Sequence, residues 1–324
     1  MSLDDLDRTL TNRLQKDFPL VARPFAELAA RTGTSEDELI ERVSKLKSSG
    51  LIRVIGPVVD ARSLGYGSTL VAMKVTRTKI GQAEQAIAGH AGISHAYERT
   101  HDFNVWLTVA VAPGADIGRE VDCLKQSTGA SEAMSLPATR VFKIGVFFDM
   151  TGEGADPAGP NPPAGRGTLS LSHLERTVLN VLQQDLPLAG EPFAAMAMEA
   201  GVSPDQFLAA VRSLRERGVI RRFGAAVNHH RAGFTSNVMS CWAVPPERVD
   251  EPAAAMVAAP DVSHCYERLT NVSWRYNLFA MIHGRHREDC EAVVARIAAA
   301  TGLDDYALLY TVREIKKTRV KYLA

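Results

Sequence analysis

The first 50 residues contain three stretches in which apolar side chains recur every three or four positions, the spacing of an amphipathic helix. These stretches cover residues 3–14, 25–30 and 36–49. Gly33 is expected to end the second helix, and Thr34 or Ser35 to cap the N-terminus of the third. Two short apolar runs, Leu51–Ile55 and Val58–Val59, then predict the strands of a β-hairpin wing. The pattern as a whole predicts a winged helix-turn-helix head.

A different pattern follows the head, in which short apolar runs typical of strands are placed around two helical stretches. The expected elements are, in order, the strand Ser68–Val75, the helix Gly81–Gly89, the strands Ile93–Glu98 and Asn104–Val111, the helix Ile117–Ser127 and the strand Arg140–Phe148. The order βαββαβ is that of a split βαβ, ferredoxin-like domain. The predicted fold class is therefore α+β.

The whole pattern occurs twice along the chain. Asp17–Leu20 recurs as Asp185–Leu188, and Ser94–Arg99 recurs as Ser263–Arg268. The segment between the copies is rich in Pro and Gly and has no large apolar side chain, so it is predicted to be a linker. The predicted organisation is a head at 1–62, a ferredoxin-like domain at 63–150, the linker at 151–168, a second head at 169–230 and a second ferredoxin-like domain at 231–324. We expect the copies to pack as an internal pseudo-heterodimer, while further homodimerisation stays open.

Composition narrows the class of protein. Apolar residues make up 46% of the chain and charged residues 23%, as in ordinary globular proteins, and no apolar run is long enough to span a membrane. The N-terminus lacks the basic and apolar regions of a signal peptide, and the four scattered cysteines form no Cys-x-x-Cys pair. We expect a soluble, cytoplasmic protein with reduced thiols and no membrane partner.

Charge bears on whether the heads bind DNA. Lys plus Arg equals Asp plus Glu at 37 each, whereas DNA-binding domains usually carry a basic excess. The third helix of the first head begins with Glu36–Glu38, where a recognition helix needs cationic or amide side chains. The matching helix of the second head begins at Pro204, and its cations Arg212 and Arg215 come only later. DNA binding is therefore the disfavoured interpretation, and we expect the heads to serve the packing of the two copies.

The duplicated motif Ser-His-x-Tyr-Glu-Arg carries the strongest chemical signal. Strand alternation places His95, Tyr97 and Arg99 on one face, with Ser94, Ala96 and Glu98 on the other. The second copy places the same side chains together, namely His264, Tyr266 and Arg268. An imidazole, a phenol and a guanidinium on one face supply two hydrogen-bond donors and a fixed cation, a set suited to a carboxylate.

The two copies differ around this motif. His101 follows the motif in the first copy, whereas the second copy has a longer loop in which Trp274 and Arg275 can wall and clamp a large planar anion. His283 ends the next strand of the second copy, where the first copy has Ala110. This asymmetry suggests that the second copy holds the better-equipped pocket, although His283 is equally well explained as a surface histidine at a strand end.

Further cations follow each head and the last strand of each copy. Arg53 lies in the first wing, and Arg221 and Arg222 lie in the second, where they can face a ligand of the adjoining domain. Lys143 and Lys316 on the last strands add a further cation to each copy, and for Lys316–Lys317 ordinary surface charge is the better explanation. Motifs for a dinucleotide, a P-loop, a zinc protease or a nucleophile elbow are missing from the sequence. The sequence therefore predicts a cationic, histidine-rich pocket without a covalent nucleophile or a metal site of its own.

The layout and the motifs resemble a known family. A winged helix-turn-helix followed by a ferredoxin-like domain is the arrangement of the Lrp/AsnC transcription factors. The segments S-H-A-Y-E-R-T-H-D-F-N-V-W at 94–106, S-H-C-Y-E-R at 263–268 and W-R-Y-N-L-F-A-M-I-H-G at 274–284 look like the two subunits of siroheme decarboxylase, an Lrp/AsnC-like enzyme of haem d1 and alternative haem biosynthesis. Arg222–Gly224 and Phe142–Lys143 share this resemblance. The chain is similar to both subunits joined in one polypeptide.

The resemblance implies the non-oxidative removal of CO2 from the C12 and C18 acetate side chains of siroheme, which gives 12,18-didecarboxysiroheme. It implies no organic cofactor, because the tetrapyrrole itself takes up the electron pair released by C–C cleavage. His264 or His283 is then the proton donor, with Tyr266 assisting by a hydrogen bond, or else one of the two histidines is an axial ligand of the siroheme iron.

The remaining candidates bind substrate or complete a second site. The substrate-binding residues of the second copy are expected to be Arg268, Arg222, Arg221, Arg275 and Trp274. In the first copy, a second site or the other wall of a shared site is expected from His95, Tyr97, Arg99, His101 and Arg53. The active copy, the order of the two decarboxylations and the pathway that uses the product stay open. The competing functions are an Lrp/AsnC-type ligand-responsive regulator and a haem-binding sensor or carrier.

Overall fold

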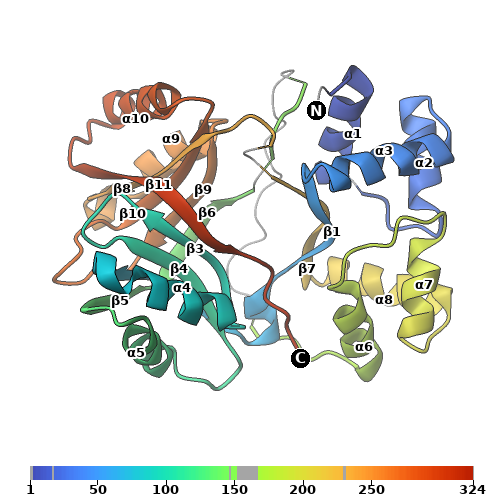
Figure 1. The fold of residues 1–324 in the computed structure, drawn as a ribbon, viewed down its shortest axis with the longest axis horizontal. Helices are drawn as coiled ribbons and strands as arrows, with labels where there is room; N and C mark the ends of the chain where they lie inside the picture. The colour runs from blue at the N-terminus through green and yellow to red at the C-terminus, as the bar shows by residue number, and fades with distance from the viewer. Residues whose placement is uncertain (1–2, 17, 146, 152–166, 229–230, 324) are drawn as a thin grey trace.

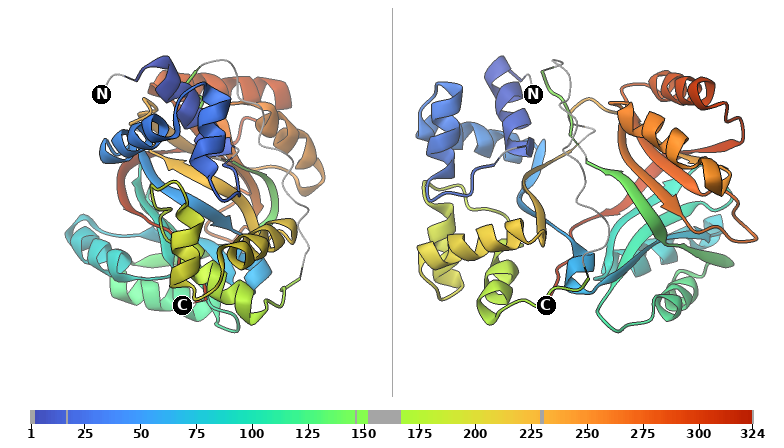
Figure 2. Two further views of the ribbon diagram at one scale, coloured as in Figure 1. Left: turned by 90° about the vertical axis from the view of Figure 1, so that its right-hand side faces the viewer. Right: turned by 180° about the vertical axis from the view of Figure 1, so that it is seen from behind.

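The computed structural model describes residues 3–16, 18–145, 147–151, 167–228 and 231–323. Two helical heads lie next to each other at one end of the molecule, and a large curved sheet with outer helices forms the other end (Figures 1 and 2). A two-stranded ribbon runs between these two parts. Residues 152–166 of the predicted linker lie outside the described residues.

Each head contains the three helices that the hydrophobic spacing predicts. They are α1 (Asp5–Lys16), α2 (Pro24–Thr32) and α3 (Glu36–Ser48) in the first head, and α6 (His173–Leu182), α7 (Pro192–Glu199) and α8 (Pro204–Glu216) in the second. Gly33, with φ of 71°, ends α2 in the left-handed region that favours glycine. Ser35 caps α3 by accepting a hydrogen bond from the Glu38 amide at 3.2 Å, and Ser203 caps α8 in the same way. These local predictions are confirmed.

The two heads share one hydrophobic core, which contains side chains from both copies. The ring of Phe18 lies 5.5 Å from the ring of Phe223 in the other copy. At the surface of this contact, the Lys47 ammonium pairs with the Asp185 carboxylate at 2.6 Å. Burial of apolar surface is the main stabilising contribution in such a contact, so each head depends on the other for much of its stability.

The prediction of a wing hairpin in each head is wrong. Residues Ile52–Val59 form one continuous strand, β1, which pairs antiparallel with β7 (Ile220–Val227) of the other head. Pro57, which lacks an amide hydrogen, is tolerated inside β1 because a two-stranded ribbon has an open edge. Gly56 and Gly224 face each other across the ribbon, and a Cβ at Gly224 would lie only 2.5 Å from a main-chain oxygen of α1. Each strand therefore finds its hydrogen-bond partner in the other copy.

The rest of the chain forms one nine-stranded sheet with the order β5-β2-β4-β3-β11-β8-β10-β9-β6. Its strands are β2 (Gly67–Lys74), β3 (Ile93–Arg99), β4 (Val105–Val111), β5 (Glu132–Leu136), β6 (Ala138–Ile144), β8 (Ser236–Trp242), β9 (Val262–Arg268), β10 (Leu278–Gly284) and β11 (Tyr306–Lys317). The helices beside it are α4 (Ile80–Gly89), α5 (Ile117–Thr128), α9 (Asp250–Ala258) and α10 (Arg287–Thr301). Short 3-10 turns lie at Ala61–Leu64, Arg77–Lys79 and Pro246–Arg248.

The last strand of each copy crosses into the other copy. β6 pairs with β9, and the C-terminal part of β11 pairs with β3. The prediction that the strand Arg140–Phe148 closes the first domain is therefore wrong, because β5 closes it and β6 belongs to the sheet of the second copy. Pro137 separates β5 from β6 and cannot donate to a ladder, so one pairing ends there before the next begins. In β11 the same change of partner occurs between Tyr310 and Thr311.

The two halves of the sheet pack with their inner faces together. Separate cores form under α4 and α5 on the first half and under α9 and α10 on the second. A further core joins the inner faces and includes Phe103 and Trp106 from the first copy with Trp274 and Phe279 from the second. The two edge strands β5 and β6 meet at Pro137, which means that the sheet curls around this inner core.

Candidate active site

Two rows of His, Tyr and Arg face the space between the two halves of the sheet. On β3, Ala96 belongs to the core under α4 and α5, so His95, Tyr97 and Arg99 point to the inner face. On β9, Cys265 belongs to the core under α9 and α10, and the alternating residues again point inward. This second row consists of His264, Tyr266 and Arg268. The alternation predicted for these side chains is confirmed.

Each row runs from the heads toward the inner core. The C-terminal end of β11, from which the chain continues to the heads, pairs with His95, whereas Thr311 pairs with Arg99 deeper in the sheet. In the second row, the guanidinium of Arg268 lies 5.5 Å from the ring of Phe279, which belongs to the inner core. The histidines therefore lie at the end of the rows that faces the heads, and the arginines at the closed end.

Neither arginine has an acidic partner among the described residues, although Arg99 is only 5% exposed and Arg268 is partly buried. Nη1 of Arg99 donates to the Leu309 carbonyl oxygen at 3.0 Å and to Oγ1 of Thr311 at 3.1 Å, and Nη1 of Arg268 donates to the Leu136 carbonyl oxygen at 2.8 Å. Within the described residues, no carboxylate pairs with either guanidinium, and Nε of each makes no hydrogen bond. Burial lowers the pKa of both arginines to about 10. A buried cation without a counter-ion is destabilising, so this pair is suited to bind anionic groups.

The side chains above the arginines are neutral at neutral pH. Burial lowers the pKa of His95 to about 4, and the nearby charge of Lys317 acts in the same direction. Burial also lowers the pKa of His264 to about 4, and the next contribution comes from His95, because the two imidazoles face the same space. Burial raises the pKa of Tyr97 to about 12 and also raises that of Tyr266. The site thus offers uncharged hydrogen-bond donors above two fixed cations.

A bulge brings a serine into the second row. The register of β9 and β10 shifts between Met281 and Ile282. Oγ of Ser263 lies 2.9 Å from Nδ1 of His264 and 2.9 Å from Nε2 of His283. Strict alternation assigned this serine to the opposite face, and that assignment is wrong because a bulge places two residues opposite one. His283 is thereby connected to the row through a single hydroxyl.

The first copy has the bulge without the second histidine. The register of β3 and β4 shifts between Ile93 and His95, and Oγ of Ser94 lies 2.9 Å from Nδ1 of His95. Ala110 stands where the second copy has His283. The serine of the first copy therefore contacts one histidine, whereas that of the second copy contacts two.

The strands that cross between the copies give the two rows different neighbours. Beside the first row, β11 carries the charged residues Glu314 and Lys317. At the corresponding positions beside the second row, β6 carries Val141 and Ile144. The crossing strand next to His264 is consequently less polar at these positions than the crossing strand next to His95.

The ribbon between the heads and the sheet supplies two more arginines. Arg53 of β1 pairs with Glu314 at 3.4 Å, and Arg221 of β7 pairs with Asp60 at 2.7 Å. Their charges act on the tyrosines of the first and second rows respectively, which places them at the head end of the site. Arg222 instead donates to a main-chain carbonyl at the end of α1 at 2.8 Å. The structure thus brings two of the three predicted wing arginines to the rows and directs the third to the head.

Three other predicted residues, His101, Trp274 and Arg275, lie away from His95 and His264. Trp274 is 3% exposed inside the inner core, and its ring lies 5.2 Å from the ring of His101. Arg275 is exposed and pairs with Asp305 at 2.7 Å. These side chains pack at or beyond the closed end of the rows, where Trp274 contributes to the floor.

The lysines on the crossing strands bind helix ends on the outer side of the sheet. Nζ of Lys143 donates to the carbonyl oxygens of Val257 and Ala259 at the end of α9, at 3.0 and 3.1 Å. Lys316 binds three carbonyl oxygens at the end of α4 in the same manner. Cations at a helix C-terminus satisfy carbonyls that have no partner in the helix, so both lysines stabilise the strand crossing.

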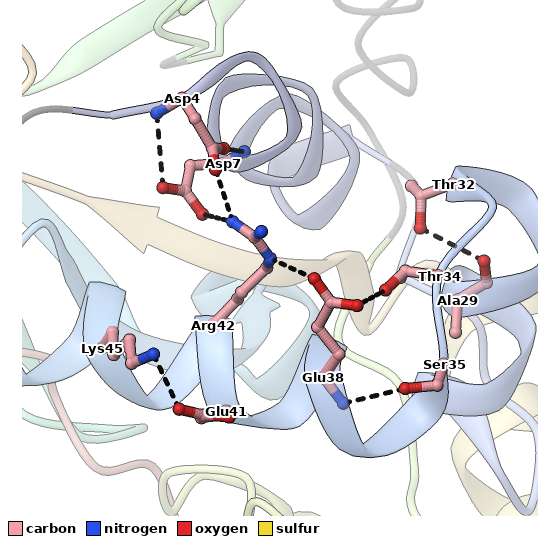
Figure 3. A network of polar contacts seen from close by, with 10 residues as sticks. All are labelled: Asp4, Asp7, Ala29, Thr32, Thr34, Ser35, Glu38, Glu41, Arg42 and Lys45. Atoms are coloured by element: carbon pink, nitrogen blue, oxygen red, sulfur yellow. Dashed lines mark hydrogen bonds and ion pairs between the residues drawn. The ribbon is translucent and has the colours of Figure 1, made fainter.

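The predicted recognition helix of the first head is occupied by internal ion pairs. Arg42 on α3 donates to Asp4 at 2.8 Å, to Asp7 at 2.9 Å and to Glu38 at 3.1 Å (Figure 3). The Thr34 hydroxyl and then Arg42 lower the pKa of Glu38. The first turn of α3 therefore presents carboxylates, and the cations beside it, Arg23 and Arg42, are already bound to them.

The described residues contain no group of three or more His, Cys, Asp or Glu side chains that could hold a metal ion. A hollow of about 440 Å³ lies beside the bend of β11, and Thr311 in its lining separates it from the buried arginine of the first row. Two of the arginines that line this hollow are already paired, since Arg287 binds Glu291 and Arg313 binds Glu98. They differ in this respect from the two arginines of the rows.

Sequence reasoning missed the residues that distinguish the two rows. Ser263 is the first residue of the duplicated motif and could be identified from the sequence. The bulge that turns its side chain inward, however, depends on the pairing of β9 with β10. Glu314 and Lys317 beside one row, and Val141 and Ile144 beside the other, could be assigned only once the strand crossing was known.

The fold and the site together define a class: a duplicated AsnC-like protein in which each copy contributes one row of His, Tyr and Arg to the inner face of a shared sheet. The model of the AsnC-like ligand-binding domain matches residues 63–143 and 231–316, and that of the siroheme decarboxylase NirDL-like HTH domain matches residues 7–53 and 175–221. None of the helices in the described part of the chain is both long and apolar enough to cross a membrane.

Individual relatives agree with these domain matches. A siroheme decarboxylase of Hydrogenobacter thermophilus is 38% identical over 320 residues, which cover 96% of this chain and 93% of that protein. The siroheme decarboxylase beta subunit of Methanosarcina barkeri is 41% identical over 144 residues, or 44% of this chain and 95% of that subunit. The crystal structure of the siroheme decarboxylase NirDL in co-complex with an iron-uroporphyrin III analogue matches with a TM-score of 0.74 and 33% identity, covering 99% of this chain and 95% of that one. The chain belongs to the siroheme decarboxylase family, which confirms the predicted resemblance and the tandem fold.

Proposed function

We propose that the chain decarboxylates siroheme at the C12 and C18 acetate side chains and releases 12,18-didecarboxysiroheme. Its membership of the family supports this reaction, and the observation that carries the proposal is the pair of buried arginines, Arg99 and Arg268, without acidic partners. A guanidinium binds a carboxylate through two parallel hydrogen bonds, and siroheme presents several carboxylates on one planar ring. A ligand-responsive regulator is not favoured by the family to which the chain belongs.

Substrate binding begins with the cations at both ends of the rows. Arg99 and Arg268 hold carboxylates at the closed end, and Arg53 and Arg221 hold others at the head end, after exchanging part of their contact with Glu314 and Asp60. Because both rows face one space, the first copy supplies the second wall of a shared site rather than a separate one.

Bond cleavage is assigned to the side of the second row. Val141 and Ile144 border a carboxylate there with apolar surface, which stabilises the charged ground state poorly, while Tyr266, the direct cross-strand neighbour of Val141, donates a hydrogen bond to it. The C–C bond then breaks, CO2 leaves and the electron pair moves into the tetrapyrrole. No organic cofactor is needed for this step.

Protonation of the remaining carbon completes the reaction. Oγ of Ser263 makes hydrogen-bond contacts with Nδ1 of His264 and with Nε2 of His283. We therefore assign the other ring nitrogen of His264, Nε2, to the contact with substrate. It donates a proton to the CH2 carbon, which becomes a methyl group. Binding of His283 to the iron through Nε2 would break its contact with Ser263, so we assign His283 to proton supply rather than to axial ligation.

Mass spectrometry after anaerobic incubation with siroheme tests the proposal. The parental chain is expected to remove two CO2 per siroheme, and His264→Ala to slow this loss by about 100- to 10,000-fold, the usual contribution of general acid–base catalysis. His173→Ala, an exposed histidine on α6, is the matched control. If the parental chain leaves the mass of siroheme unchanged, the proposed function is wrong; if His264→Ala and His283→Ala both match the parental rate, the catalytic assignment is wrong.

The proposal extends to the partners of the chain. The internal ion pairs of α3 and the shared core of the heads support a packing role without DNA binding. All four cysteines are free thiols, which supports a cytoplasmic location. The internal pseudo-dimer contains both rows, so a further homodimer is not required for the site.

A further inference from the structure

We propose that Ser263 is a proton relay that couples His283 to His264, and that it makes the second row the side of the site on which the carbon is protonated. The inference rests on the proposed function and adds a positioning residue to it. In this assignment His264 contacts the substrate, whereas Ser263 and His283 act through it.

The geometry of the hydroxyl group carries the proposal. Oγ of Ser263 lies 2.9 Å from one nitrogen of each imidazole, and a hydroxyl can accept a hydrogen bond from one group while it donates to another. Donation to Nδ1 of His264 fixes the tautomer in which Nε2 carries hydrogen. The third contact, to the Met281 carbonyl oxygen, is longer at 3.3 Å and uses the same hydrogen. The serine is 7% exposed, so bulk water does not easily replace it.

The surroundings of His264 explain why a relay is useful. Burial keeps this imidazole neutral at pH 7, and a neutral imidazole that loses its only proton becomes an unfavourable anion. A proton delivered to Nδ1 at the same time removes that difficulty. Ser263 is the hydroxyl in hydrogen-bond contact with Nδ1, and His283 is the titratable group behind it.

Each proton that leaves one group in this step is taken up by the next group. When CO2 has left, the carbon takes the proton from Nε2 of His264. Nδ1 of His264 takes the proton of the Ser263 hydroxyl, and Ser263 takes the proton from Nε2 of His283. In this step His283 passes from imidazolium to neutral imidazole, and His264 is left with its hydrogen on Nδ1. A proton from solvent water then binds Nε2 of His264, and the Nδ1 proton returns through Ser263 to Nε2 of His283, which restores all three groups before the next decarboxylation.

The first copy provides an internal contrast. Ser94 makes the same 2.9 Å contact with Nδ1 of His95, but Ala110 occupies the position of the second histidine. The local hydrogen bond is therefore present in both copies, and among the described residues the contact with a second imidazole is made by Ser263 and not by Ser94. Ser94→Ala is consequently a matched control for the local bond alone.

The test compares Ser263→Ala with Ser94→Ala in single-turnover decarboxylation of siroheme. We expect Ser263→Ala to slow CO2 loss by about 10- to 100-fold and Ser94→Ala by less than about 3-fold, with siroheme affinity unchanged in both by absorbance titration. In a double-mutant cycle, His283→Ala should add little to Ser263→Ala, because both remove the same relay. Equal effects of the two serine variants, or additive effects of Ser263→Ala and His283→Ala, would overturn the proposal.

Two measurements separate a relay from a merely structural role. The parental rate should fall in D2O with a curved proton inventory, since several protons move together, and Ser263→Ala should give a linear one. Ser263→Thr, which keeps the hydroxyl, should recover most of the rate. Independently of turnover, 15N spectra of labelled histidines should show hydrogen on Nε2 of His264 in the parental chain and a mixture of tautomers in Ser263→Ala. An unchanged tautomer and a linear inventory in the parental chain would refute the relay. If the parental chain itself leaves siroheme unchanged, the failure lies in the proposed function instead.

Discussion

The two copies of this chain have the same strand motif and the same bulge, yet they build unlike halves of one site. Next to His95 the crossing strand supplies Lys317, and next to His264 it supplies Ile144. The first copy has Ala110 where the second has His283. The pairing of the motif strand with its neighbours is the same in both copies. The differences lie in the side chains that the neighbouring strands place beside each row.

This comparison shows that the two copies of a duplicated fold can have different roles in one site. Burial lowers the pKa of Arg99 and of Arg268 to about 10 alike, which suits a planar substrate that presents carboxylates to both sides. The groups around the histidines are not equivalent, so only the second row combines an apolar wall with two connected imidazoles. Binding is shared by the copies, and bond breaking is assigned to one of them.

The largest expected effect tests the shared part of the comparison. Arg99→Met and Arg268→Met should each weaken siroheme binding by about 10- to 100-fold, since each removes charge-assisted hydrogen bonds to a carboxylate. Each variant should also unfold at a higher temperature without substrate, because it removes a buried charge that has no counter-ion. Absorbance titration and thermal unfolding measure the two effects, with Arg296→Met on the exposed face of α10 as control. A variant that binds siroheme normally would show that its row does not hold a carboxylate.

A smaller effect tests the difference between the walls. Ile144→Lys gives the second row the residue that the first row has at this position, and it should slow decarboxylation by about 10-fold, because an ammonium stabilises the carboxylate before cleavage. The reverse change, Lys317→Ile, should alter the rate by less than about 3-fold. Single-turnover rates at saturating siroheme measure both. Equal rates for the two variants would mean that the walls do not decide where cleavage occurs.

The smallest expected effect is on the pH dependence of thermal stability, to which the histidines of the two rows should contribute equally. Folding lowers the pKa of His95 and His264 to about 4 from the ordinary 6.5, so the unfolded chain binds more protons between these values. The stability that these groups contribute is therefore present above pH 6.5 and is lost as the pH falls toward 4. Thermal unfolding at pH 7 and pH 5 should show a decrease that His95→Gln and His264→Gln each reduce by on the order of 3 °C. A much larger change in one variant than in the other would contradict the equivalence of the two imidazoles.

Local features of the fold could be predicted from the sequence because they depend on neighbouring residues. Gly33 and Ser35 identified helix ends, and the alternation around Ala96 identified the face that carries the chemistry. The ribbon and the crossing strands could not be predicted in the same way. A strand such as β1 pairs equally well with its own copy or with the other copy as far as its hydrophobic pattern is concerned, and the tertiary packing of the heads decides between them.

The same limit applies to the site. The duplicated motif predicted both rows, because His, Tyr and Arg at alternate positions of a strand lie on the same face. It did not predict that Trp274 packs into the floor or that Arg222 turns toward the head, since each depends on which surface covers it. Ser263 shows this most clearly, because one extra residue in a ladder reverses the face on which it lies.

The crossing of β6 and β11 has a consequence for how such a protein is made in the cell. Each half completes the sheet of the other, and Lys143 and Lys316 attach the crossing strands to helices of the opposite half. A half expressed alone would expose an unpaired strand edge, so its solubility would depend on synthesis of the other half in equal amount. One polypeptide that carries both halves meets this requirement through its reading frame, because the two halves are then always made in equal amount.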